Sequence, residues 1–352
     1  MVGSMWRRVF GRRKAKVTPQ RAATVRSRAP AIAAATPVAE TPASAEAPSL
    51  AHIDERFHRL VLGLPPAGHE QPPPAEIALL RRLELLGTRF DLRSLPRLPT
   101  VLPQLLRTLK SDEAAGGELA KLVGRDPLMV GEVMRATSTV FYRSAQPISS
   151  LQQAVVLLGQ DGLRRVITQH VMKPILQGNT GAMGHAAGGR LWGHAERCAH
   201  ACAWLGRSVG CDPFEAYLAG IVRHAGTGAV VRLLDQLIPG EAPPPLSAGF
   251  VQHCAMLASR LSLQAARQWE LPARVLEAMV ECQGEVGAST SPLGRALAVA
   301  DSLASLRMLV ENHDFPADTD LSPCWPGAMT PALITRCQRD LESHFAVGMA
   351  GG

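Results

Sequence analysis

One histidine and two cysteines fall at a spacing that suits metal chemistry. His194, Cys198 and Cys202 follow one another at intervals of four residues, which places them on one face of a helix. Imidazole and thiolate are ligands for soft and borderline metal ions. The alternative, which we favour, is a buried helix face in which the thiols act as small apolar side chains. The chain has 7 cysteines and no Cys-x-x-Cys pair, so we expect reduced thiols in a cytoplasmic protein.

A glycine-rich stretch at 178–189 is the second feature that could bind a ligand. It lacks the Lys-Ser or Lys-Thr that follows a phosphate-binding loop. We interpret it as a mobile connector between two helical lobes. Local signatures of a covalent nucleophile are also missing from the sequence.

The elements that would position such residues are helical. Each of four dipeptides pairs a capping side chain with a proline suited to the first helical turn. These are Asp126-Pro127, Asp212-Pro213, Ser291-Pro292 and Thr330-Pro331. Ser149 and Ser150 stand before Gln152 and Gln153 at the spacing of a capping box. Alternating strand patterns are rare, so the sequence predicts an all-α, two-lobed helical bundle of about a dozen helices.

Two further helices are predicted outside the capped segments, and a third follows the Thr330-Pro331 cap. One is short and lies around 52–62, and a second runs from Ile77 to Leu86 with Gly87 as its stop. The last spans 331–346 and is expected to pack through one apolar face. That face consists of Leu333, Ile334, Cys337, Leu341 and Phe345.

The basic charge of the 352-residue chain is confined to its start. The formal net charge is +7, yet residues 1–39 hold nine Lys and Arg and no acid, which leaves 28 basic against 30 acidic residues afterwards. The rest of the chain therefore has no electrostatic footprint for nucleic acid. Any contact with an anionic membrane or a nucleic acid would be made by the tail. Its candidate residues are Arg7, Arg8, Arg12, Arg13, Lys14 and Lys16.

Composition and pattern divide the chain into segments. Residues 1–49 are basic and rich in Ala and Pro, which predicts a disordered tail. Residues 50–94 form a helical lead-in, and 311–352 form a C-terminal loop and helix. No apolar run is long enough to cross a membrane. We expect a cytoplasmic protein that the tail can hold at the periphery of the inner membrane, although a solvated tail is the favoured interpretation.

A succession of motifs carries a family resemblance. The segments are Leu95–Pro103, Glu118–Leu128 with its Asp-Pro-Leu turn, Val133–Ser138, Pro147–Gly159 and Leu163–Val166. Together with the half that starts at Leu191-Trp-Gly-His194, they resemble the HDOD domain, the HD-related output domain of bacterial signalling proteins. The resemblance implies a domain over 95–310, with lobes at about 77–176 and 190–308, the second of them HD-like. The chain departs from the family in having Thr137-Ser138 where Asn-Ser is expected.

HDOD domains resemble HD phosphohydrolases, whose metal site uses a His, a His-Asp dyad and a distal Asp. The resemblance places His194 in the first position and Asp301 in the last, while the dyad has become Arg223-His224. Arginine has no lone pair to donate and repels a cation. Shifting the alignment by one residue puts Ala225 in the carboxylate position. We therefore expect a relic site with no metal, no cofactor and no catalytic residue.

Arg223 and His224 leave two interpretations open. They can bind an anion, because guanidinium and imidazole suit a phosphate, or they can pair internally with Asp301. A buried Asp301 without a metal needs a compensating cation. We expect Arg223 or His224 within hydrogen-bond distance of it, whereas His194 is interpreted as a packed helix residue.

The sequence thus predicts a catalytically inactive HDOD signalling module that acts through contact with an unidentified signalling protein. The resemblance also implies an association with cyclic-dinucleotide signalling. Two alternatives remain: a divergent metal-dependent phosphohydrolase, and a sensor that binds an anionic nucleotide near Arg223.

Overall fold

The computed structural model describes residues 49–88, 115–138, 148–178, 181–238, 245–283 and 290–346, apart from 326 and 328. The expectations for the basic tail, including Arg7 to Lys16, and for the Leu95–Pro103 motif lie outside these residues. The described helices all belong to one unit that spans Glu46–Gly352.

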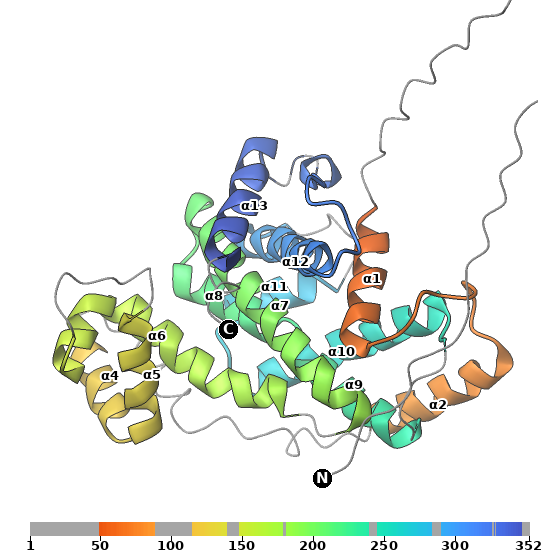
Figure 1. The fold of residues 1–352 in the computed structure, drawn as a ribbon, viewed down its shortest axis with the longest axis horizontal. Coiled ribbons are helices and arrows are strands. Elements are labelled where there is room, and N and C mark those ends of the chain that lie inside the picture. The colour runs from red at the N-terminus through yellow and green to blue at the C-terminus, as the bar shows by residue number, and fades with distance from the viewer. Residues whose placement is uncertain are drawn as a thin grey trace, which may run out of the picture. The chain divides into compact units, whose positions relative to one another are not determined.

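The predicted all-α class is confirmed, because the described residues form helices and no strand (Figure 1). The helices of the first half are α1 (Leu50–Leu62), α2 (Pro74–Thr88), α4 (Ala115–Gly124), α5 (Pro127–Thr137), α6 (Leu151–Gln177) and α7 (Ala182–Ser208). Those of the second half are α8 (Pro213–Val222), α9 (Ala225–Leu237), α10 (Ala248–Gln268), α11 (Ala273–Glu281), α12 (Pro292–Glu311), a 3₁₀ turn (Ser322–Cys324) and α13 (Pro331–Ala346).

Capping chemistry sets several of these starts as predicted. Asp126 and Asp212 accept backbone N–H groups at the starts of α5 and α8, and Ser291 accepts the N–H of Gly294 at 2.9 Å at the start of α12. Ser150 caps α6 in the same way, and α13 begins at Pro331. These side chains replace the missing intrahelical acceptors of the first turn.

Glycines lie at two of the predicted helix boundaries. The predicted stop at Gly87 agrees to within one residue with the end of α2 at Thr88, and Gly87 is buried where a Cβ would approach Leu257 to 2.9 Å. The 178–189 stretch is not a connector, because α7 already begins at Ala182. A Cβ on Gly188 would lie 2.8 Å from the carbonyl oxygen of Gln177. In both places the missing side chain permits close packing, and at Gly188 the helix continues through the glycine.

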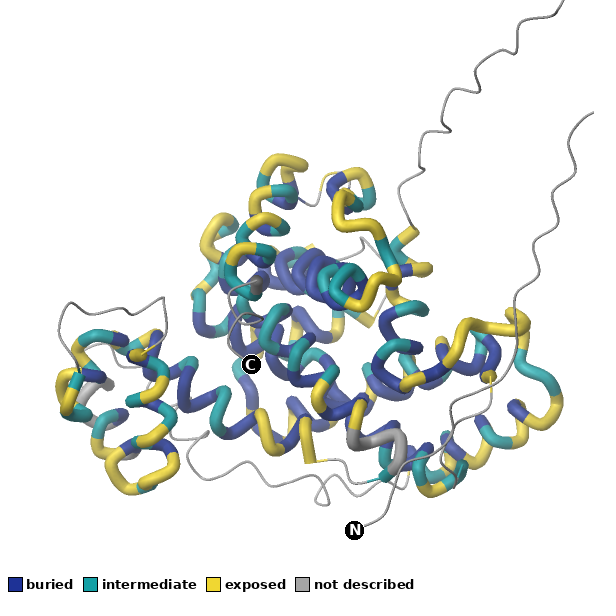
Figure 2. The backbone as a smooth tube through the Cα atoms, in the orientation of Figure 1, coloured by how far each residue is buried: buried dark blue, intermediate teal, exposed yellow. Residues whose placement is uncertain are grey.

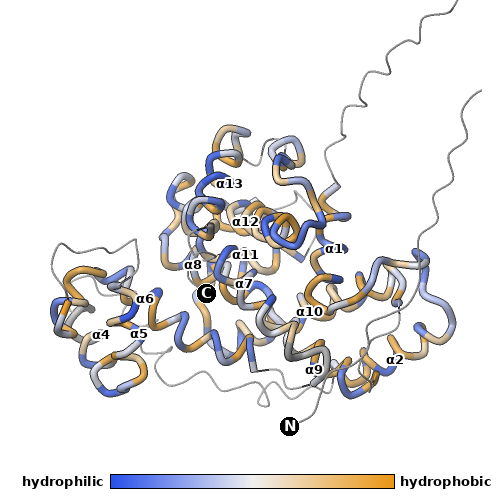
Figure 3. The backbone as a smooth tube through the Cα atoms, in the orientation of Figure 1, coloured by the Kyte–Doolittle hydropathy of each residue, from blue (hydrophilic) through white to orange (hydrophobic). Residues whose placement is uncertain are grey.

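Helix α7 packs against many of the other described helices. It packs on α8, α9 and α12, and α10 packs on α9. Helix α12 is largely buried in Figure 2 and largely hydrophobic in Figure 3. Helices α4 and α5 pack on α6, which in turn packs on α7, α8 and α9. Helix α2 packs on α9 and α10, which belong to the predicted second lobe.

The two ends of the described chain close on this core. Helix α1, predicted around 52–62, is confirmed and packs on α7, α10 and α12. Helix α13 packs on α7 and α12. Its predicted apolar face is confirmed: Ile334, Cys337 and Leu341 are buried, while Leu333 and Phe345 are partly buried. None of the described helices combines the length and apolar character that crossing a membrane requires.

Candidate functional site: a buried His-Arg-His-Asp cluster

The four residues singled out from the sequence lie together. His194 is on α7, Arg223 ends α8, His224 begins α9 and Asp301 is on α12. Their contacts connect residues up to 107 positions apart. The predicted convergence is therefore present in the structure.

Two glycines let the Arg223-His224 junction approach its neighbours. A Cβ on Gly220 would lie 2.6 Å from the Cα of Ala199 on α7, and one on Gly226 would lie 2.2 Å from the carbonyl oxygen of Ala258 on α10. Such separations exclude any side chain. The junction is thereby wedged between α7 and α10, with its two polar side chains beside α12.

Asp301 accepts hydrogen bonds on both carboxylate oxygens. Arg223 Nε donates to Oδ2 at 3.0 Å, and His224 Nε2 donates to Oδ1 at 2.9 Å. The Nε2 atom of His194 lies 3.2 Å from Oδ1. The expectation that Arg223 or His224 reaches Asp301 is confirmed for both residues.

Burial and charge set the protonation of the cluster. Burial lowers the pKa of His224 to about 3, against the attraction of Asp301. Burial alone would raise the pKa of Asp301, but His224 and the Arg223 guanidinium outweigh it and hold that pKa well below its usual range. The attraction of Asp301 likewise outweighs burial at Arg223, whose pKa is raised. The cluster thus holds one carboxylate, one guanidinium and a neutral His224.

Neighbouring groups take up the remaining polar atoms of Arg223. Its Nη1 donates to Ser259 Oγ at 3.2 Å, and its Nη2 donates to the Cys282 carbonyl at 3.4 Å. The hydroxyl of Ser305 lies 3.2 Å from His194 Nε2. His194 Nδ1 is buried with no hydrogen-bond partner among the described residues, which suits an unprotonated nitrogen better than an unpaired donor.

Helix α1 covers the cluster, which the sequence did not reveal. Phe57 is fully buried, and its ring centroid lies 4.3 Å from that of His194 and 5.3 Å from that of His224. His58 is also buried, with its ring 5.8 Å from His224. Arg59 fixes the helix by donating to the carbonyls of Pro65 and Leu246. The only sequence signal was the apolar periodicity of 52–62, which shows burial but not the target.

The cluster can be tested as a metal site. The ligand atoms of His194, His224 and Asp301 lie within 4.8 Å of one another, so their spacing would accommodate an ion. Their charges do not fit one. The Arg223 guanidinium already cancels the carboxylate, so a divalent ion would remain uncompensated in a buried place. Both imidazoles also direct Nε2 at the same oxygen rather than at a shared vacant point.

The soft-metal alternative on α7 gains no support. Cys198 and Cys202 are fully buried, and burial raises the pKa of both thiols well above its usual value. Among the described residues, ligand spacing occurs only in the group of His194, His224 and Asp301. The favoured buried-face interpretation agrees with this burial.

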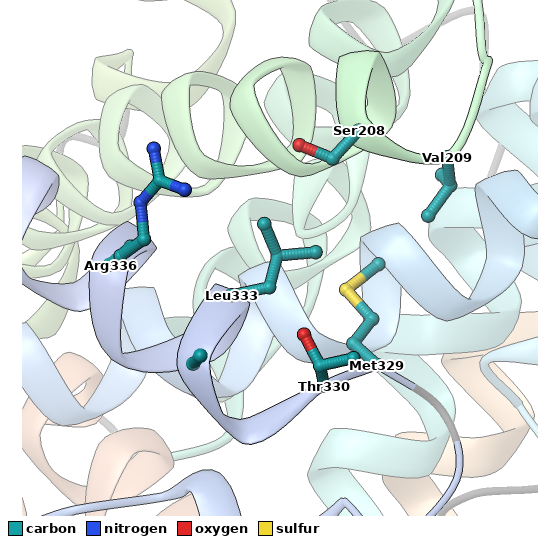
Figure 4. Close-up of a pocket in the computed structure, with 7 residues that line it drawn as sticks. Ser208, Val209, Met329, Thr330, Leu333 and Arg336 are labelled. Atoms are coloured by element: carbon teal, nitrogen blue, oxygen red, sulfur yellow. The ribbon is translucent and has the colours of Figure 1, made fainter.

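A hollow of about 430 Å³ lies elsewhere, between the end of α7 and the start of α13. Figure 4 shows Leu333 and Met329 facing Ser208 and Val209 across it, with Arg336 at one side. Ser208 is 14 residues beyond His194 on α7, which is about 21 Å along a helix. The hollow is therefore separate from the cluster.

Comparison with solved structures supports the fold. An HDOD domain protein of unknown function from Geobacter sulfurreducens matches with a TM-score of 0.54 and 18% identity, covering 78% of this chain and 95% of its own. A suspected metal-dependent phosphohydrolase from Shewanella amazonensis SB2B has a TM-score of 0.51 and 14% identity, with 77% and 99% covered. A suspected signal transduction protein from Marinobacter aquaeolei VT8 has a TM-score of 0.51 and 18% identity, with 88% and 67% covered.

Comparison with curated proteins finds no match. The family model of the HDOD domain matches residues 95–284, just over half of the chain. This range includes His194, Arg223 and His224 and ends before Asp301. With the all-helical fold, the match identifies this chain as a member of the HDOD domain family.

Proposed function

We propose that this chain is a catalytically inactive HDOD module that acts in bacterial signal transduction by binding a partner protein. The observation that carries the proposal is the ion pair between Arg223 Nε and Asp301 Oδ2 at 3.0 Å. A fixed cation takes the place where an HD enzyme would need a ligand. The carboxylate is thereby satisfied by groups of the chain itself.

Access to the cluster supports the same proposal. Phe57 lies over both imidazoles, and α1 buries Ile53, Val61 and Leu62 as well. Burial of side chains of this kind stabilises by roughly 1.5–3 kcal/mol each. Opening the cluster would cost the sum of these contributions. Access of a substrate to Asp301, whose side chain is only 15% exposed, is therefore expected to be restricted while α1 is in place.

Metal analysis and an activity assay test this proposal together. The full chain is purified after growth with iron and manganese, its metal content is measured, and hydrolysis of cyclic dinucleotides and of a simple phosphodiester is assayed. We expect far less than one ion per chain and no hydrolysis. A full equivalent of iron or manganese with hydrolysis that a chelator abolishes would overturn the proposal.

The second candidate is a divergent metal-dependent phosphohydrolase. The observation in its favour is the spacing of His194, His224 and Asp301 within 4.8 Å. The variant Asp301→Asn separates the two candidates. In an enzyme it would abolish both metal content and activity, whereas in the proposed module it would change stability alone.

A nucleotide sensor at Arg223 is the weaker alternative, because that guanidinium already contacts Asp301, Ser259 and the Cys282 carbonyl. Thermal-shift measurements with nucleotides test it, since a ligand at 100 times its Kd adds about 2.7 kcal/mol of stability. We expect no shift. A link to cyclic-dinucleotide signalling, a cytoplasmic location and contact through the basic tail remain part of the proposal.

A further inference from the structure

Some of the exposed large apolar side chains of the described residues lie on two helices that pack together. Exposed large hydrophobic residues are Ile77, Leu85, Leu128, Val156, Met256 and Val280. Half of them lie on α2 and α10, which pack against each other. Ile77 is 40% exposed, Leu85 50% and Met256 48%. Single exposed hydrophobic residues need no explanation, whereas a group on adjacent helices marks a candidate contact surface.

Three of the exposed residues of α2 form one stripe. Ile77, Arg81 and Leu85 are spaced four residues apart and all are exposed, so they follow one another along the helix surface. The opposite face of α2 is buried through Leu80, Leu83 and other residues. The outer stripe thus alternates an apolar, a cationic and an apolar side chain.

Helix α10 supplies a second stripe beside the first. Gln252, Met256 and Arg260 are exposed at the same interval of four residues. Arg260 Nη2 donates to Glu84 of α2 at 2.6 Å, which ties the two stripes together. Two adjacent helices with outward stripes of this kind form a shallow seat for a third helix.

The charge of this surface is positive. Arg81 and Arg82 are exposed, and neither forms an ion pair with a described residue. Glu84 lies beside the first stripe, and its carboxylate is already paired with Arg260 of the second. The partner that complements the surface carries acidic residues beside an apolar stripe.

We propose that the outer face of α2 and α10, called here the α2–α10 face, is the docking surface for an acidic amphipathic helix of a partner protein. The proposal rests on the proposed function and gives its partner a chemistry. A membrane fits less well. The three apolar side chains are half covered by their own neighbours rather than projecting, and Glu84 among them would face anionic lipid.

Three synthetic amphipathic helices test the charge preference. They share one leucine stripe and differ in an acidic, neutral or basic polar face, and their binding to the full chain is followed by fluorescence anisotropy. We expect the acidic helix to bind at least about tenfold more tightly than the others, with the preference weakened by salt. The paired substitution Arg81→Glu with Arg82→Glu should reverse it.

Matched variants locate the binding. Leu85→Ser should weaken binding, whereas Val280→Ser, at a similarly exposed residue of α11, should not. Lys121→Glu with Arg125→Glu provides the charge control, because Lys121 on α4 and Arg125 just after this helix are both exposed. Hydrogen peroxide should oxidise Met256 in the free chain, and the acidic helix should slow this oxidation.

Several outcomes would overturn the proposal. One is equal binding of all three helices, or binding that the Arg81 and Arg82 substitutions leave unchanged. Another is resistance of Met256 to oxidation in the free chain, because this would show that the chain itself or a second copy already covers the α2–α10 face. Binding to phosphatidylglycerol vesicles that depends on Arg81 and Arg82 would assign the face to a membrane. None of these results changes the outcome of the metal and activity measurements, so failure of this proposal can be distinguished from failure of the proposed function.

Discussion

Replacement of Arg223 by methionine removes the guanidinium from Asp301 and keeps a long apolar side chain. Both partners of the pair are largely buried, with 13% and 15% of their side chains exposed. Breaking a buried ion pair by removal of one partner costs about 3–5 kcal/mol. Asp301 keeps the two imidazole donors, so we expect a loss of about 3 kcal/mol in the free energy of unfolding near pH 7.

The pH dependence of this loss identifies its cause. In the native chain the pKa of Asp301 lies well below its usual range, so its contribution to stability is present above the unfolded pKa of about 3.9 and is lost as pH falls towards the lower folded value. In Arg223→Met the pKa of Asp301 or His224 rises, because the fixed cation no longer stabilises the carboxylate or opposes protonation of the imidazole. The variant gains a proton at a higher pH, so its deficit should shrink between pH 7 and pH 4.

Urea unfolding of both proteins, measured at intervals across that pH range, checks the prediction. Arg274→Met is the control, because Arg274 is 75% exposed and lies 3.8 Å from Glu215; its loss should stay below about 1 kcal/mol and vary little with pH. A deficit for Arg223→Met below about 1 kcal/mol, or one that stays constant from pH 7 to pH 4, would refute the assignment of Arg223 as the counter-ion of a buried Asp301.

Three further predictions follow from other parts of the fold. Burial lowers the pKa of His344 to about 4 and also lowers that of His200, and the two ring centroids lie 3.9 Å apart. Stability should therefore fall as pH drops below about 6.5, and His344→Gln should flatten that dependence in urea titrations. Gly159 has φ 63° and ψ −178° inside α6, so Gly159→Ala should lower the free energy of unfolding by about 1–3 kcal/mol, measured by thermal unfolding. Gly131→Ala on α5 is the control, because a Cβ there meets no atom within 4 Å; it should cause no loss of stability. Phe57→Ala should destabilise the chain by about 3–5 kcal/mol, and a smaller calorimetric effect would show that α1 does not hold the cluster closed.

Local chemistry explains what the sequence could predict. The helix starts at Asp126, Asp212 and Ser291 rest on hydrogen bonds between residues two or three positions apart, which a sequence displays directly. The presence of Arg223 is equally visible, because the inability of arginine to ligate a metal does not depend on its surroundings. The all-α class and this non-ligating residue were therefore determined by the sequence.

Tertiary packing decided the rest. Arg223 and His224 both reach Asp301, 78 and 77 residues away, and Phe57 covers the cluster from α1. Both arrangements depend on how the helices pack against one another. The same holds for Gly188, which the sequence alone placed in a connector, yet which lies inside α7 because its missing side chain makes room for the Gln177 backbone. Glycine's local cost of about 1 kcal/mol in a helix is smaller than the gain from close packing, and that gain exists only once the partner helix is in place.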